Sequence, residues 1–319
     1  MKNNNLVILG GNSNQELCRE ICDTLETTPG KVEVGRFPEG EIRVQIQQNI
    51  RGRDVFILQS TSTPPNDHLM ELLVLVDAAR RASASRITAV LPFFGYARQD
   101  RKDRPRVPIT AKLIANLITV SGADRVLTMD LHANQIQGFF DIPVDHLYSI
   151  NVLGEYFLRK RLKNLTVVSP DVGGIKMARA YAKRLNADLA IVDKRRESDR
   201  KTQVMHIIGT VKDRNVILVD DLISTGGSLV GAARALKKAG ALDVYATVVH
   251  PVLADPAVSR IRESDLKELV VTNTIRIPKE KRISKIHVLS VAKLLAEAIQ
   301  RIHTNESVSS LFRRAAVEA

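Results

Sequence analysis

Short apolar runs alternate with helical patterns along most of the 319-residue chain, and this alternation restricts the fold more than any other feature. The runs are rich in valine, isoleucine and leucine, which is typical of strands buried on both faces of a parallel sheet. Helices between such strands cover the two faces. We therefore expect an α/β fold with mainly parallel sheets. The expected strands are 6–9, 55–59, 87–91, 125–129, 166–169, 189–192, 216–219, 244–249 and 269–272, and the expected helices include 14–25, 66–82, 109–121, 174–185 and 290–301.

The pattern divides the chain into two similar halves, which we predict to be domains of residues 1–146 and 147–319. No repeat of 20 to 50 residues appears, which excludes a solenoid. No apolar run approaches the roughly 18 residues of a membrane span, so we expect a soluble protein. Cys18 and Cys22 are the two cysteines, too few for a disulfide framework or a zinc site. We therefore predict a cytoplasmic location.

The formal net charge of +12 favours acidic partners, either nucleic acid or small phosphates. Aromatic residues make up 4% of the chain, which gives few stacking platforms for single strands, and we find no DNA-reading helix. Small phosphates are the favoured partners, with nucleic acid as a minor alternative.

The most informative stretch runs from Asn215 to Ala232. A buried strand is expected to end at Val219, and two carboxylates, Asp220 and Asp221, follow it. Glycines and hydroxyls then lead into a helix, whose first N–H groups and partial positive charge favour phosphate. These loop residues are Ser224, Thr225, Gly226, Gly227 and Ser228. The simpler interpretation is a strand-to-helix turn with capping residues, but acids beside a phosphate cradle favour a ribose phosphate site.

The same arrangement occurs after the strand 166–169. Asp171 and Val172 precede Gly173 and Gly174, which open the next expected helix. Capping alone explains a second such loop poorly. Two cradles in one half indicate a diphosphorylated sugar.

Four further segments contain polar residues with plain structural explanations. Phe37, Glu39, Gly40 and Glu41 form a turn between strand-like segments, where a simple hairpin is favoured by the residues alone. Arg98 and Gln99 lie in a charged loop after the strand 87–91 that is either a solvated surface or a nucleotide grip. His132 follows the strand 125–129 and without context is more often structural than a ligand. Lys194 and Arg196 lie in a charged segment, Asp193 to Thr202. The segment is either a mobile charged loop or a loop whose basic side chains neutralise the charge of a polyphosphate.

Taken in order, these motifs resemble those of class I ribose-phosphate pyrophosphokinases over about residues 4–312. The resemblance implies two similar domains with the fold of type I phosphoribosyltransferases. For ATP and its metal, it implies ATP contacts from Phe37, Glu39, Gly40, Glu41, Arg98 and Gln99, and magnesium contacts from His132 and Asp171. For the sugar, it implies a pyrophosphate loop at 171–174 and ribose 5-phosphate contacts from Arg196, Asp220, Asp221 and 224–228. It also implies a catalytic flexible loop that contains Lys194 and Arg196.

The implied reaction transfers the β,γ-diphosphoryl group of Mg-ATP to the 1-hydroxyl of ribose 5-phosphate, giving 5-phosphoribosyl 1-diphosphate and AMP for nucleotide biosynthesis. The resemblance also implies a homohexamer that phosphate activates and ADP inhibits. Its regulatory regions would include Arg51, Arg104, His146 and 307–309, and we expect the added tail after Phe312 to alter assembly and regulation.

Ser224 departs from the family pattern, because many members have aspartate there. Two alternatives stay open. A phosphoribosyltransferase would use the same cradle without needing the N-terminal half. A non-catalytic subunit of a synthetase complex is favoured by Ser224 and opposed by the other retained motif residues.

Overall fold

The computed structural model describes residues 5–196 and 203–312. The chain divides into two compact units, each with its own sheet. Of the described residues, unit 1 takes in 5–148, 274–276 and 290–312, and unit 2 takes in 149–196, 203–273 and 277–289. The expected α/β architecture is confirmed in both.

Unit 1 contains a five-stranded sheet in the order β1-β4-β5-β6-β7, with every neighbouring pair parallel. Its strands are β1 (Leu6–Gly10), β4 (Asp54–Leu58), β5 (Arg86–Leu91), β6 (Arg125–Met129) and β7 (Val144–Leu147). The order follows the sequence from one edge to the other, so each crossover moves the chain in the same direction across the sheet.

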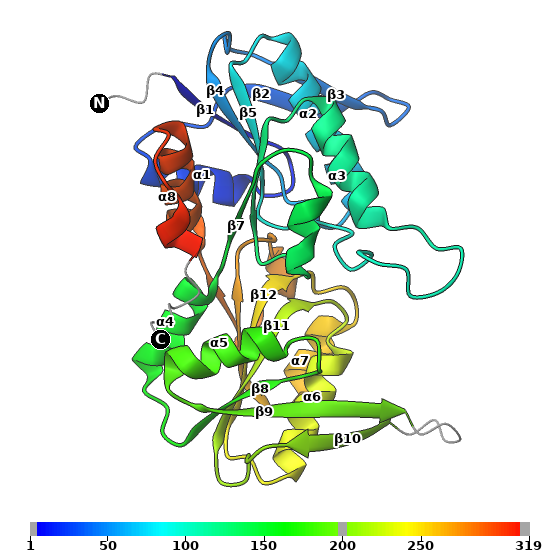
Figure 1. Cartoon of the computed structure of the whole chain (residues 1–319), viewed down its shortest axis with the longest axis vertical. Helices are drawn as coiled ribbons and strands as arrows, with labels where there is room; N and C mark the ends of the chain where they lie inside the picture. The colour runs from blue at the N-terminus through cyan, green and yellow to red at the C-terminus, as the bar shows by residue number, and fades with distance from the viewer. Residues whose placement is uncertain (1–4, 197–202, 313–319) are drawn as a thin grey trace. The chain divides into compact units, whose positions relative to one another are not determined.

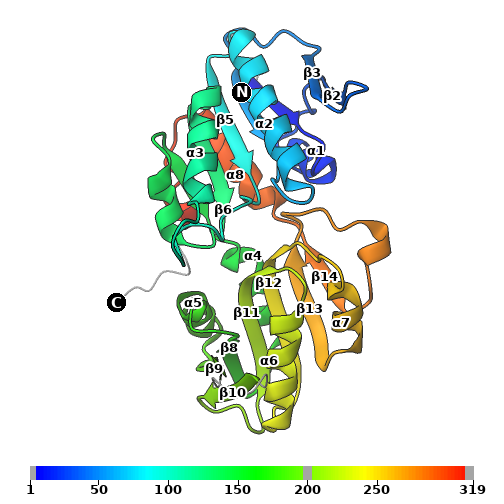
Figure 2. The ribbon, with the colours of Figure 1, turned by 90° about the vertical axis from the view of Figure 1, so that its right-hand side faces the viewer.

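Helices cover both faces of this sheet (Figures 1 and 2). Leu9 and Ile57 belong to the core beneath α2 and α3, whereas Ile8 and Phe56 belong to the core beneath α1 and α8. Because successive strand residues point to opposite faces, uninterrupted apolar runs supply both cores. Helix α8 packs beside α1 although it follows unit 2 in the sequence. The helices are α1 (Gln15–Thr24), α2 (Pro65–Arg81), α3 (Thr110–Ser121) and α8 (Ala292–His303), with short turns η1 (Asn134–Phe139) and η3 (Ser309–Phe312).

An antiparallel hairpin of β2 (Val32–Arg36) and β3 (Ile42–Ile46) leaves the main sheet of unit 1. Val34 and Val44 pack against the core under α2, which holds one face of the hairpin on the unit. The polar residues that alternate with them face outward, as the period of two predicts.

Unit 2 contains a seven-stranded sheet in the order β10-β9-β8-β11-β12-β13-β14. Its β9–β10 pair is antiparallel and the other pairs are parallel. The strands are β8 (Leu165–Ser169), β9 (Asp188–Arg196), β10 (Gln203–Ile208), β11 (Asn215–Ile223), β12 (Val244–Pro251), β13 (Leu266–Thr272) and β14 (Ile286–Leu289). The helices are α4 (Ile150–Lys160), α5 (Ile175–Leu185), α6 (Gly227–Lys238) and α7 (Ala257–Glu263), with a short turn η2 (Lys279–Lys281). Figure 2 shows α6 lying along β11 and β12.

Strands β9 and β11 lie on opposite sides of β8, so the direction of the crossovers reverses there. Such a switch point opens a crevice at the carboxyl ends of the strands, where ligands bind in open α/β sheets. The loops after β8 and β11 both start at this edge. Unit 2 therefore presents two neighbouring strand-to-helix loops at the place that topology favours for a ligand.

The expected end of β11 was wrong. The sequence predicts a strand that ends at Val219, but parallel pairing with β12 continues to Ile223, with Asp220 opposite Val248. The neighbouring β12 is buried along its whole length and continues to offer backbone partners. An aspartate keeps the backbone N–H and C=O groups that pair with β12, so Asp220 and Asp221 lie within the strand.

Candidate functional site

The loop after β8 is a tight turn held by its own polar groups. The Ser169 hydroxyl donates to the backbone oxygen of Asp171 (2.6 Å), and the Gly174 N–H donates to Asp171 Oδ1 (3.0 Å). Helix α5 then begins at Ile175 without a side-chain cap. A Cβ on Gly174 would lie 2.7 Å from Ser169 Oγ, so a larger residue would displace the hydroxyl that holds this turn. Val172 and Gly173 are exposed, which leaves the turn open to a ligand.

The loop after β11 is fixed from the side of α7. Arg260 Nη1 donates to the backbone oxygen of Thr225 (3.0 Å). Gly226 has a φ of 74°, a conformation that favours glycine, and a Cβ there would lie 3.5 Å from Ala257 Cα. Helix α6 begins at Gly227 without a side-chain cap, and Thr225, Gly227 and Ser228 are exposed. Uncapped N–H groups at an exposed helix start suit an anion.

The acids of β11 lie between these two loops. Burial raises the pKa of the Asp220 carboxyl well above its ordinary value, and the nearby charges of Asp221 and Asp171 raise it further. The Asp221 N–H donates to Asp220 Oδ1 (2.9 Å). Asp171 comes from the β8 loop, so the two loops and both strand acids share one electrostatic environment. A ligand that brings hydroxyl donors or a cation would relieve the repulsion.

The donor chemistry of this edge fits magnesium, which prefers oxygen ligands. Within residues 5–196 and 203–312, no group of three or more His, Cys, Asp or Glu side chains is placed to hold a metal. Magnesium is commonly held by one or two carboxylates together with substrate phosphates and water. The carboxylates of Asp171, Asp220 and Asp221 therefore fit an ion that arrives with a polyphosphate better than a resident structural ion.

In unit 1, the predicted ATP turn lies at the tip of the β2–β3 hairpin. The Phe37 N–H donates to the backbone oxygen of Glu41 (2.9 Å), and the Gly40 N–H donates to that of Phe37 (2.9 Å). Gly40 has a φ of 100°, which explains the glycine in this turn. The Phe37 side chain is 44% exposed, and Glu39 and Glu41 are also exposed. An exposed aromatic ring beside acids can stack on a base while the acids accept hydrogen bonds from hydroxyl groups.

The second predicted ATP segment follows β5 and leads into α3. Arg98 and Gln99 are exposed. The Gln99 N–H donates to the backbone oxygen of Tyr96 (2.9 Å), and Gln99 Oε1 accepts from Thr110 Oγ1 (2.5 Å). These bonds fix the loop to the first turn of α3 and leave the Arg98 guanidinium available for phosphate oxygens.

His132 is exposed after β6 in unit 1, whereas the other predicted magnesium residue, Asp171, belongs to unit 2. Their pairing stays a prediction. Of the predicted regulatory residues, Arg51 and Arg104 are exposed, whereas His146 is buried and its Nε2 accepts from the Leu131 N–H (2.9 Å).

Lys194 and Arg196 lie at the end of β9, where the sequence predicts a loop beginning at Asp193. That expectation was wrong for 193–196, because antiparallel pairing with β10 extends the strand. The side chains of Lys194 and Arg196 and the remaining loop residues 197–202 lie outside the described part of the structure.

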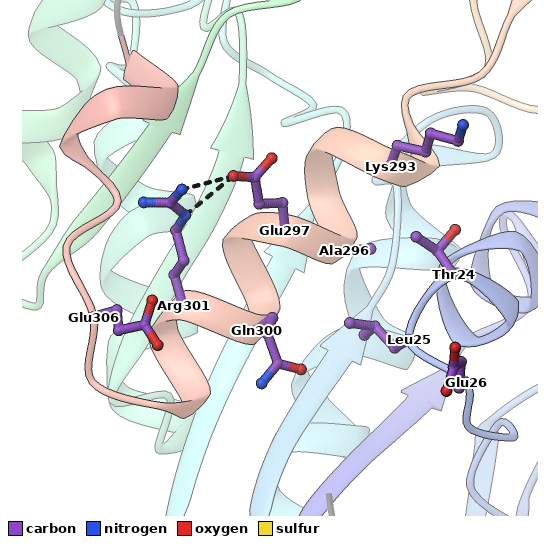
Figure 3. Close-up of a pocket in the computed structure, with 9 residues that line it drawn as sticks. All are labelled: Thr24, Leu25, Glu26, Lys293, Ala296, Glu297, Gln300, Arg301 and Glu306. Carbon is purple, nitrogen blue, oxygen red and sulfur yellow. Dashed lines mark hydrogen bonds and ion pairs between the residues drawn. The ribbon is translucent and has the colours of Figure 1, made fainter. Parts of the chain in front are cut away.

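A groove of about 550 Å³ lies in unit 1 between the end of α1 and helix α8 (Figure 3). Arg301 within it already pairs with Glu297 at 2.7 Å, and three glutamates share the lining. The groove therefore offers mixed charge and contains none of the predicted site residues. Its lining residues are Thr24, Leu25, Glu26, Lys293, Ala296, Glu297, Gln300, Arg301 and Glu306.

Comparison with known proteins decides the family. Residues 6–122 match the N-terminal domain of ribose phosphate pyrophosphokinase, and residues 196–313 match the phosphoribosyl synthetase-associated domain. A ribose-phosphate pyrophosphokinase of Bacillus cereus is 54% identical over 310 residues, which cover 97% of this chain and 98% of that protein. The chain belongs to the ribose-phosphate pyrophosphokinase family.

Other ribose-phosphate pyrophosphokinases are similarly close. The protein of Corynebacterium ammoniagenes is 53% identical over 310 residues, which cover 97% of this chain and 98% of that protein. The crystal structure of phosphoribosylpyrophosphate synthetase from Mycobacterium smegmatis superposes with a TM-score of 0.90 at 42% identity, covering 94% of this chain and 99% of that one. The family inferred from the motifs is therefore confirmed, and the chain is an enzyme of this family.

None of the helices in residues 5–196 and 203–312 has the length and hydrophobicity that a membrane span requires.

Proposed function

We propose that this chain transfers the β,γ-diphosphoryl group of ATP to the 1-hydroxyl of ribose 5-phosphate, producing 5-phosphoribosyl 1-diphosphate and AMP. The observation that carries the proposal is the pair of glycine-containing loops after β8 and β11, which meet at the switch point beside Asp220 and Asp221. The near-complete coverage of family members supports the same reaction.

Ribose 5-phosphate would occupy the edge of unit 2. The backbone N–H groups of Thr225, Gly226, Gly227 and Ser228 and the hydroxyl groups of this loop, Ser224 included, would hold the 5-phosphate. Asp220 and Asp221 would accept hydrogen bonds from the ribose hydroxyls, which suits carboxylates that repel each other without a ligand. The loop of Asp171, Val172, Gly173 and Gly174 would receive the diphosphate at the other end of the sugar.

ATP would use unit 1. Phe37 would stack on adenine, and Glu39, Gly40 and Glu41 would contact the ribose. Arg98 would bind phosphate oxygens, and Gln99 would hydrogen-bond the nucleotide. Lys194 and Arg196 would neutralise charge on the transferred group, and Arg196 would also contact the sugar phosphate.

Magnesium would be held by Asp171, with His132 close to the metal-nucleotide. Bound there, the ion would neutralise phosphate charge and orient the diphosphoryl group. The residues of the chain would align the O1 atom of the sugar with the β-phosphorus, since positioning and charge neutralisation dominate phosphoryl transfer.

We also propose a cytoplasmic homohexamer in which phosphate activates and ADP inhibits. Arg51, Arg104, Ser307 and Ser309 are exposed in unit 1, which suits contact with effectors or another subunit. His146 is buried and would contribute to regulation indirectly, through its hydrogen bond with the Leu131 N–H.

The test is to mix the protein with ATP, Mg²⁺ and ribose 5-phosphate and to follow the products by phosphorus NMR, with and without inorganic phosphate. We expect sugar-dependent AMP together with an equal amount of phosphoribosyl diphosphate. Folded protein that forms no AMP in either condition would instead support the non-catalytic subunit that Ser224 favours. In a separate mixture of phosphoribosyl diphosphate and a purine or pyrimidine base without ATP, formation of a nucleotide with release of diphosphate would support a phosphoribosyltransferase.

A further inference from the structure

Helix α7 of unit 2 carries a basic side chain to which the proposed function assigns no role. Arg260 is exposed, and its Nη1 donates to the backbone oxygen of Thr225 (3.0 Å), in the loop proposed to hold the 5-phosphate. A Cβ on Gly227 would lie 3.3 Å from the same Nη1 atom, so the guanidinium lies against the first residue of α6. The Arg260 side chain therefore borders the phosphate loop.

The charges around this guanidinium favour an anion. Helix α6 begins without a side-chain cap and has no acidic residue in its first turn. Among the residues that the structure describes, no carboxylate forms an ion pair with Arg260. The N-terminus of a helix carries partial positive charge, so a guanidinium beside it without an acidic partner is unfavourable until an anion binds. A phosphate group would neutralise both.

The hydrogen bond to Thr225 also fixes the direction of a backbone donor. In a planar trans peptide the C=O and N–H groups point in opposite directions. Because Arg260 holds the Thr225 oxygen, the N–H of Gly226 in the same peptide points away from Arg260. Gly226 has a φ of 74° and the conformational freedom of glycine, so this peptide could otherwise rotate. A rotated peptide would present its oxygen to the phosphate and repel it.

Helix α7 gives Arg260 a fixed base within unit 2. Figure 2 shows α7 beside α6. Ala257 and Ile261 of α7 are fully buried in the core of the unit. At the end of the helix, Lys285 Nζ donates to the backbone oxygen of Ser264 (2.7 Å). The helix is thus held along one face and at its end, and the Arg260 side chain extends from it to the phosphate loop.

We propose that Arg260 is a positioning residue for the 5-phosphate of the sugar. By holding the Thr225 oxygen it directs the Gly226 N–H toward the phosphate, and its charge favours the bound anion. The inference rests on the proposed function, because that function assigns ribose 5-phosphate to this loop. Arg260 therefore determines the affinity for the sugar phosphate and takes no part in binding ATP.

The test compares Arg260→Ala with the native protein in steady-state kinetics for both substrates. The substitution removes the donor to Thr225 and the charge beside α6. We expect the KM for ribose 5-phosphate to rise about tenfold, whereas kcat and the KM for ATP stay within about twofold. A merely structural role would lower the melting temperature or the active fraction and leave both KM values unchanged, which would overturn the inference.

Arg262→Ala is the matched control, because it removes the same side chain from the same helix. Arg262 is also exposed, and within the described ranges its side chain forms no hydrogen bond or ion pair. We expect the KM for ribose 5-phosphate to stay within about twofold of the native value. An equal rise in both variants would show an effect of net charge alone and would overturn the positioning role.

Arg260→Lys is the conservative variant. Lysine keeps the positive charge and offers an N–H donor to the Thr225 oxygen, although without the planar fork of arginine. We expect its KM for ribose 5-phosphate to lie within about threefold of the native value. A loss as large as that of Arg260→Ala would contradict the combined role of hydrogen bond and charge.

Calorimetric binding of ribose 5-phosphate separates this inference from the proposed function. The titration contains saturating Mg-α,β-methylene-ATP, in which the bond that the reaction breaks is blocked. Weaker binding to Arg260→Ala than to the native protein and Arg262→Ala supports the positioning role even if the native protein forms no AMP from ATP. Equal affinity in all three proteins would overturn it even if the native protein is fully active.

Discussion

The two units contain parallel sheets built from similar apolar strands, but they present polar groups to ligands in different ways. In unit 2 the strand order reverses at β8, and the loops after β8 and β11 open at one edge with Asp220 between them. In unit 1 the strand order runs in one direction, and the predicted ATP residues lie on a hairpin tip and on a long loop.

This difference in strand order explains why the two units suit different ligands. A switch point brings backbone N–H groups and acids together through the sheet itself, which suits a small sugar phosphate. The sheet of unit 1 has no switch point, and there the hairpin and the long loop each contact helix α2, through the Arg36–Asp67 ion pair and the Tyr96–Asn66 hydrogen bond. Changes in unit 2 should therefore affect the sugar and the chemical step, whereas changes in unit 1 should affect ATP.

The largest effect is expected at the strand acids of unit 2. Asp221→Asn should lower kcat/KM for ribose 5-phosphate about 10²- to 10³-fold, because a neutral amide loses a charged acceptor at the sugar. Asp243→Asn is the control, since Asp243 pairs with Lys267 at 2.6 Å at the amino end of β12. Steady-state kinetics should show no more than a twofold change for the control. A similar loss of kcat/KM in both variants would contradict a specific role of the switch point in binding the sugar.

The next effect tests the backbone of the β8 loop. Gly174→Ala should lower kcat/KM about 10²-fold, because the new Cβ would lie 2.7 Å from Ser169 Oγ and displace the turn. Gly138→Ala is the matched control in unit 1, because a Cβ there meets nothing within 4 Å. Both melting temperatures should be measured. Full activity in Gly174→Ala would contradict the proposal that the backbone of this loop binds the diphosphate.

At the hairpin tip, Phe37→Ala should raise the KM for ATP about tenfold through loss of stacking and leave the KM for ribose 5-phosphate unchanged. Leu158→Ala removes another exposed apolar side chain, 41% exposed on α4, and should change neither value. Initial rates at varied concentrations of each substrate provide the measurement. An increase in the KM for ribose 5-phosphate in Phe37→Ala would contradict the assignment of ATP to unit 1 and of the sugar to unit 2.

Ser224→Asp introduces the carboxylate that the family resemblance leads us to expect in this loop. We expect turnover to stay within about tenfold of the native value, a change below roughly 1.4 kcal/mol in the barrier. The rate of AMP formation at saturating substrate measures it. A much larger gain would show that the native loop lacks an important catalytic group.

The smallest effect concerns stability. Burial raises the pKa of Asp220 in the folded chain, so the folded state binds the proton more tightly than the unfolded state, and stability falls as the pH rises above about 4. Asp220→Asn removes the charge and keeps an acceptor for the Asp221 N–H. We expect its melting temperature at pH 8 to exceed the native value by about 2 °C or more, and the difference to shrink at pH 5. A variant less stable at pH 8 would contradict the raised pKa.

Much of the fold could be predicted from the sequence because buried parallel strands and amphipathic helices have strong local patterns. The strands near Leu6, Val55 and Val216 and the helix from Asn66 were expected close to where they occur. The extension of β11 through Asp220 was not, because a partner strand distant in sequence determines it. The packing of α8 on unit 1 depends on similarly distant contacts.

The candidate site divides in the same way. Local motifs identified the loops containing Asp171 and Thr225, since an apolar strand, an acid and glycines occur together in the sequence. The buried carboxylate of Glu71 in α2, which accepts from Asn12 and Gln59, was not expected, because these partners are far from it along the chain. Its one sequence signal is an acid on the apolar face of a helix. The roles of the individual site residues stay predictions that the substitutions above test.

Hydrogen–deuterium exchange with each substrate alone tests the division between the units most directly. We predict that ribose 5-phosphate slows exchange in peptides covering 220–228, and that Mg-α,β-methylene-ATP slows exchange in peptides covering 37–41 and 93–99. Protection of 37–41 by the sugar phosphate, with exchange at 220–228 unchanged, would contradict the account.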